Sequence, residues 1–71
     1  MWYKGKINGA IRFEVKAYEN GSEFGIDGGR ISKLYVSRNG TPIIWYERGW
    51  LMQPVDETSQ QILDHLLKQY N

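Results

Sequence analysis

Apolar and polar side chains alternate most clearly between residues 10 and 18. Successive side chains of a β-strand point to opposite faces, so this pattern predicts a strand with one face toward a core. The predicted inward set is Ile11, Phe13, Val15 and Ala17, and the outward set is Arg12, Glu14, Lys16 and Tyr18.

An Asn-Gly pair at 8–9 is predicted to join residues 2–7 to this strand as a hairpin. A two-residue loop would turn two lysines into the core. A three-residue loop over 7–9, with its glycine left-handed, instead sets Tyr3 opposite Phe13 and keeps the lysines outside. Because a slip of one residue reverses every side chain, we expect the three-residue loop.

A second Asn-Gly pair, at 39–40, predicts a hairpin of residues 31–38 and 42–48. A turn like the first one places Ile44 and Tyr46 in the core, whereas a tight two-residue turn swaps them with their neighbours. We expect the first arrangement. The residues then predicted to face inward are Leu34, Val36, Ile44 and Tyr46.

The glycine-rich stretch 19–30 separates the hairpins, and its Phe24 and Ile26 either enter the core or form a short extra strand. Residues 50–52 are expected to pack in the turn toward the helix. The helix is predicted over about 56–70, with Asp56 as its N-cap. Apolar residues at helical spacing form its buried stripe, which comprises Ile62, Leu63, Leu66, Leu67 and Tyr70.

These elements predict one α+β domain over residues 1–71. A four-stranded antiparallel meander (1–50) carries one C-terminal helix on one face, in the order ββββα. The 71 residues include no cysteine and one histidine, so disulfides and thiolate zinc sites are excluded. Self-association is the stabilising device left open to so small a chain. No signal peptide or membrane segment is recognisable, and we expect a cytoplasmic protein without a cofactor.

Candidate catalytic chemistry is sparse. His65 is expected to be a half-exposed helix residue, and no nucleophile has an evident base nearby. The loop Gly28, Gly29, Arg30 suggests an anion site, because glycines let backbone N–H groups approach a phosphate. A strand follows it, however, where phosphate loops lead into a helix, so a turn is the favoured interpretation. We therefore expect no enzymatic activity.

The outer face of the predicted sheet interleaves aromatic and cationic side chains. Such a face suits a protein partner or a second copy of the chain, because tryptophan, tyrosine and arginine are enriched at interfaces. It also suits single-stranded nucleic acid, whose bases stack on rings, and an ordinary solvated face is the plain alternative. The candidate residues are Trp2, Lys4, Lys6, Arg12, Lys16, Tyr18, Lys33, Tyr35 and Trp45, with Tyr46 replacing Trp45 if the second turn is tight.

Three segments add a resemblance: W-Y-K-G-K-I at the start, G-I-D-G-G-R-I-S-K-L in the middle and R-G-W later on. Together they resemble a small family of uncharacterised bacterial and phage single-domain proteins, over nearly the whole chain. The resemblance implies a prophage or mobile-element setting and no catalytic residues. The strand and helix order is also loosely similar to the arm-binding domains of integrases, although the net charge of +1 lacks their basic character. The sequence thus predicts a protein-interaction or homodimerisation module, with weak nucleic-acid binding as the alternative.

Overall fold

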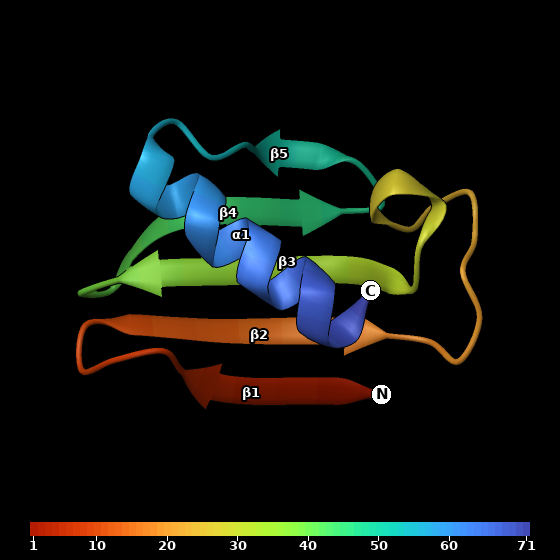
Figure 1. Ribbon diagram of the computed structural model, residues 1–71, viewed down its shortest axis with the longest axis horizontal. Helices are drawn as coiled ribbons and strands as arrows, with labels where there is room; N and C mark the ends of the chain where they lie inside the picture. Colours follow the sequence, from red (N-terminus) through yellow and green to blue (C-terminus); the bar gives the residue numbers. More distant parts are fainter.

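The computed structural model describes residues 1–71 and has two layers, an antiparallel sheet and a helix on one of its faces (Figure 1). The strands follow one another across the sheet in chain order, β1-β2-β3-β4-β5. The elements are β1 (Trp2–Lys6), β2 (Ile11–Ala17), η1 (Ile26–Gly28), β3 (Ile31–Arg38), β4 (Thr41–Glu47), β5 (Trp50–Met52) and α1 (Glu57–Tyr70). The α+β meander with a C-terminal helix is confirmed, but the sheet has five strands rather than four.

The predicted faces of the first hairpin are correct, although its loop lies one residue later than expected. Tyr3 pairs with Val15 rather than with Phe13, so the loop covers residues 8–10. An odd number of loop residues preserves the parity of the strands, and β1 therefore keeps its lysines on the outer face.

The two Asn-Gly pairs close their turns by different means. Asn39 and Gly40 have φ angles of 50° and 83°, the positive values of a tight type I′ turn. Gly9, by contrast, does not take the left-handed conformation that we expected. The Asn8 side-chain oxygen instead accepts the backbone N–H groups two and three residues further on, at 2.8 and 3.0 Å. The asparagine side chain thus replaces the backbone conformation as the device that closes the first loop.

The second hairpin has the tight turn that was not expected, yet its predicted core residues are buried. A tight turn alone would send Ile44 and Tyr46 outward. Val36 pairs with Ile44, whereas the next residue on β3 pairs with Pro42, so Ile43 is an extra residue in β4. This β-bulge restores the parity that the turn had changed. The expected core assignment is right, and the expected turn is wrong.

A fifth strand forms where we predicted only packing residues. The chain reverses at Arg48, whose φ is 57°, and Trp50 then pairs with Tyr46. Their rings meet edge to face with centroids 5.0 Å apart. This aromatic contact holds β5 against β4. Three residues are too short for an alternating pattern, and this is why the sequence pattern did not reveal the strand.

The glycine-rich segment forms a turn of 3₁₀-helix rather than the extra strand that was one alternative. Ile26 enters the core with 1% exposure, whereas Phe24 stays half exposed. Asp27 adopts φ 52°, which bends the chain within the turn. Of the two residues expected either to enter the core or to form a strand, Ile26 therefore enters the core and Phe24 does not.

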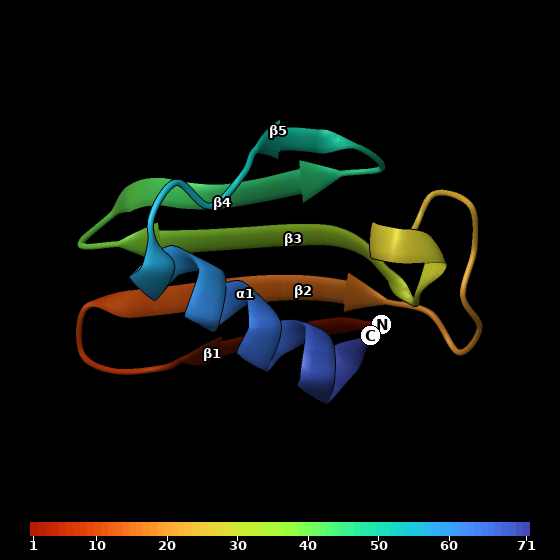
Figure 2. The ribbon, with the colours of Figure 1, turned by 45° about the horizontal axis from the view of Figure 1, so that its top comes forward.

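Helix α1 begins as predicted and crosses the inner face of the sheet diagonally (Figure 2). The Asp56 carboxylate caps it by accepting the Ser59 N–H at 2.7 Å. The buried hydrophobic residues between the two layers are Ile11, Val15, Ala17, Ile26, Ile31, Leu34, Val36, Ile44, Tyr46, Ile62, Leu63 and Leu66. Both predicted stripes, on β2 and on α1, thus contribute to one core.

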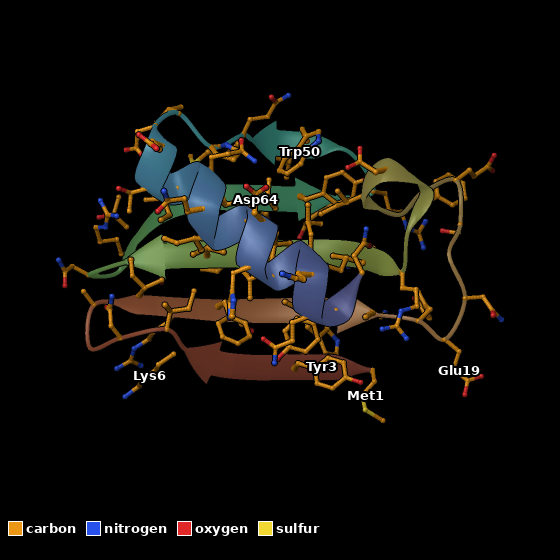
Figure 3. The ribbon with its side chains drawn as sticks, in the orientation of Figure 1. Met1, Tyr3, Lys6, Glu19, Trp50 and Asp64 are labelled. Carbon is orange, nitrogen blue, oxygen red and sulfur yellow. The ribbon has the colours of Figure 1, made fainter.

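Aromatic rings fasten the C-terminal end of α1 to the N-terminal edge of the sheet (Figure 3). The Tyr70 ring lies 4.9 Å from Tyr3 and 6.0 Å from Phe13. Phe13 faces inward as predicted but is only partly buried, because only β1 lies beyond it. Its ring fills the space beside Gly5, where a Cβ would lie 2.8 Å from the ring.

Candidate functional site

The outer face of the sheet carries no helix, and strand register arranges its side chains in three rows. Residues that pair across antiparallel strands share a face and contact one another. The rows are Trp2, Lys16, Lys33 and Glu47; then Lys4, Glu14, Tyr35, Trp45 and Met52; then Lys6, Arg12, Ser37 and Pro42. The register therefore brings eight of the nine predicted residues of the outer face onto one surface, and Tyr18 is the one outside the rows.

The centre of this surface is an aromatic pair. Tyr35 and Trp45 are cross-strand partners on β3 and β4, and their rings meet edge to face at 5.5 Å and 88°. Both side chains are half buried by their neighbours. Met52 pairs with Trp45 from β5 and adds a flexible apolar group beside the ring. On β3, β4 and β5 the central row thus offers an apolar contact area, beside the charged Lys4 and Glu14 on β1 and β2.

A second aromatic group surrounds Lys16 at one end of the sheet. Its ammonium lies 5.9 Å from the Trp2 ring centre and 5.4 Å from the Tyr18 ring centre. The hydrogen bond and the positive charge of Lys16 lower the pKa of the Tyr18 phenol. Trp2 and Tyr18 are about half exposed, so both rings are open to a ligand that approaches the face. Tyr18 thus lies beside Lys16 at this end of the sheet.

Cations on this face lie opposite other cations. Lys16 pairs with Lys33 across β2 and β3, and Lys6 pairs with Arg12 across β1 and β2. Like charges directly opposite one another destabilise a sheet. The one ion pair of the molecule joins Lys4 and Glu14 at 3.5 Å, in the row between these two pairs.

Charge is therefore unbalanced at both ends of the face. The outer face carries five cations but only two carboxylates, Glu14 and Glu47. Glu47 lies opposite Lys33 without forming an ion pair. The surface consequently presents an aromatic centre between two positive ends, and negative charge on a partner would stabilise both ends.

Sequence reasoning missed Met52, because its position on the face depends on the unexpected strand β5. Its partner Trp45 is on the outer face because of the bulge at Ile43. A three-residue strand leaves no periodic signal. The Arg-Gly turn at 48–49, with an aromatic residue directly after it, is the feature that points to this strand.

The glycine-rich loop that suggested an anion site is engaged within the chain. The N–H groups of Gly28 and Gly29 donate to carbonyls of their own turn. Arg30 donates to the Tyr70 carbonyl at 3.0 Å, and the Asn71 side chain bonds to the backbone on both sides of the loop at 3.0 and 3.1 Å. The loop thus holds the end of α1. An anion site there stays a prediction, and most of its donors already have partners.

Candidate catalytic and metal-binding groups are few. His65 lies exposed on α1, and no group of three or more His, Asp or Glu side chains is placed to hold a metal ion. Helix α1 is too short and too polar to cross a membrane.

Comparison with known proteins agrees with the resemblance noted above. No curated protein and no solved structure matches the chain. A family model described as a domain of unknown function, DUF7678, matches residues 1–71. The match covers the whole chain, and the protein belongs to this family.

Proposed function

We propose that this protein is a small non-enzymatic binding module whose outer sheet face recognises an acidic surface of a protein partner. One observation carries the proposal: the Tyr35–Trp45 pair lies between two sets of cations that have no carboxylate bonded to them. Aromatic residues supply contact area at the centre of an interface, and complementary charge at its rim selects and orients the partner.

Charge also favours a different protein over a second copy on this face. Two outer faces placed against each other would bring five cations near five others, with only two carboxylates from each copy. Juxtaposed like charges disfavour such a contact. Homodimerisation through the outer face remains the second form of the proposal, and sedimentation tests it.

The size of the face indicates weak, transient binding. Five strands about 4.8 Å apart, with about six residues each on average and about 3.4 Å per residue, give a face of about 500 Å². A stable interface of standard size buries about 800 Å² on each partner. The contact therefore belongs to the small, reversible class, and charge complementarity contributes mainly to its rate of association and its specificity.

A pair of peptides tests the proposal: a short synthetic peptide of alternating glutamate and leucine, and its glutamine–leucine counterpart. We expect the glutamate peptide alone to shift the amide NMR signals of β1, β2 and β3 on the outer face, with an affinity that falls as salt rises. Lys16→Glu places opposite charges across β2 and β3 and should abolish the shifts. Lys68→Glu on the exposed side of α1 changes the net charge equally and should not.

The outcomes separate the alternatives. Equal binding of the two peptides, or equal loss in both variants, would refute charge recognition by this face. Sedimentation velocity over the micromolar range should show a monomer. A dimer that dissociates on Trp45→Ser but persists on Lys68→Glu would establish the homodimer form instead.

Nucleic-acid binding is a second candidate, favoured by the Lys16 ammonium between two exposed rings. Bases stack on such rings, and phosphates are attracted to the cations. Single-stranded oligothymidine should then quench tryptophan fluorescence at low salt. Trp2→Phe and Trp45→Phe should each reduce the quenching, whereas Trp50→Phe, on the helix side, should retain it. Absence of quenching at low salt would exclude this candidate.

The setting of the module is part of the same proposal. We place it in the cytoplasm, because a chain without cysteine suits a reducing compartment. A bacterial or phage origin follows from the resemblance of its three segments. Localisation of a tagged full-length chain in a bacterial host tests the compartment.

A further inference from the structure

A hollow of about 330 Å³ lies on the helix side of the molecule, away from the outer sheet face. It is bounded by the loop after β1, the end of β3 and one side of α1. Its buried members Ile11 and Ile62 form an apolar bottom, whereas Arg38, Gln61 and His65 are more exposed and form a polar mouth. An apolar cavity with a few convergent polar groups is the usual form of a small-molecule site, and this volume is at the small end of the range.

We infer that this hollow binds a small organic anion with an apolar body, whose charged group is held by Arg38. The Arg38 side chain is partly buried, and its guanidinium forms no ion pair and donates no hydrogen bond within the chain. A cation without a partner leaves its hydrogen-bond donors open to an anionic ligand. The planar guanidinium matches a carboxylate or phosphate with two parallel hydrogen bonds.

No carboxylate lines the hollow. A competing group is Asp56, at the N-terminus of α1, whose carboxylate accepts the Ser59 N–H at 2.7 Å and whose pKa the charge of Arg38 also helps to lower. This hydrogen bond is the main cause of the lowered pKa of Asp56, and the charge of Arg38 contributes less. Asp56 is therefore engaged with the helix end and leaves Arg38 available to a ligand, although its charge weakens the attraction.

Three probes distinguish charge from apolar contact in the wild-type protein. Benzoate combines both features, benzamide keeps the ring without the charge, and inorganic phosphate keeps the charge without the ring. In an amide NMR titration we expect benzoate to shift Ile11, Arg38 and His65 saturably in the millimolar range. Benzamide should bind about tenfold more weakly, the loss expected for one charged hydrogen-bonded contact. Phosphate should shift these signals less than benzoate does.

Two variants change the charge around the hollow in opposite directions. Arg38→Gln should weaken benzoate binding by about tenfold. Asp56→Ser keeps a good helix cap, removes the competing carboxylate and should strengthen binding. Lys68→Gln removes an exposed cation elsewhere on α1 and should leave binding unchanged.

The wild-type comparison does not depend on whether a variant folds. Benzamide binding as tight as that of benzoate would overturn the inference, as would the absence of saturable shifts at these residues. Benzoate shifts confined to the outer sheet face would also overturn it, without affecting the proposed function of that face.

Discussion

Replacement of Tyr46 by phenylalanine isolates the hydrogen bond that ties β4 to the glycine-rich segment. The Tyr46 hydroxyl donates to the Phe24 carbonyl at 2.9 Å, and the tyrosine is 6% exposed. Phenylalanine keeps the ring and its edge-to-face contact with Trp50. The substitution therefore removes one partly buried hydrogen bond and leaves its acceptor without a partner in the chain. We expect a loss of about 1–1.5 kcal/mol in the free energy of unfolding.

Tyr35→Phe is the matched control, because Tyr35 lies on the adjacent strand and its hydroxyl has no partner in the chain. Its loss should stay within about 0.5 kcal/mol. Urea denaturation followed by circular dichroism measures both, with an unchanged slope m if only stability changes. For a domain of this size the Tyr46 variant should melt about 4–12 °C lower.

Amide hydrogen exchange tests the effect of the Tyr46–Phe24 hydrogen bond locally. Amides of η1 should exchange faster in Tyr46→Phe and unchanged in Tyr35→Phe, because only the first variant releases the segment from β4. Equal destabilisation by the two substitutions would refute the reasoning, since the loss would then come from the ring environment and not from the Tyr46 hydrogen bond.

Two further predictions concern backbone packing and pH. Gly5→Ala should lower the free energy of unfolding by about 1 kcal/mol, because overpacking against the Phe13 ring exceeds the gain from a less flexible unfolded chain. Gly9→Ala has open space around its Cβ and should be neutral or slightly stabilising in the same urea titration. The pKa of Asp56 is lowered in the folded protein, chiefly by the Ser59 N–H, so its stabilising contribution is present above the unfolded pKa and is lost as pH falls from about 5. Asp56→Asn keeps a cap and should show a smaller loss of stability on acidification than the wild type; identical pH profiles would contradict this.

The part of the candidate outer face on β1 and β2 was predictable from local pattern, whereas the positions of Trp45 and Met52 depend on the bulge at Ile43 and on strand β5. Alternation around Arg12 and Lys16 determines which side chains point away from the core, and the parity of the first hairpin extends this face to Trp2. The pairing of charged residues across the strands was not predictable from local pattern. The direct pairing of Lys16 with Lys33 depends on the register between β2 and β3, which no local signal specifies.

The hollow beside Arg38 lay beyond sequence reasoning for a related reason. Its walls come from a loop, a strand end and a helix that are far apart in the chain. Only the packing of α1 across the sheet brings His65 near Arg38. The same holds for Asn71, whose side chain bonds to the glycine-rich segment through contacts some forty residues away in sequence.

By itself the sequence determined the four longer strands and the helix, and the buried sides of β2 and α1, because burial of apolar groups imposes a period of two or 3.6 residues on the chain. The stripes on β2 and α1 and the Asp56 cap follow from that local chemistry. Tertiary structure alone decided the bulge at Ile43 and the short strand β5. Each depends on a distant partner, since the free energy that selects it comes from packing against neighbouring strands rather than from the segment's own residues.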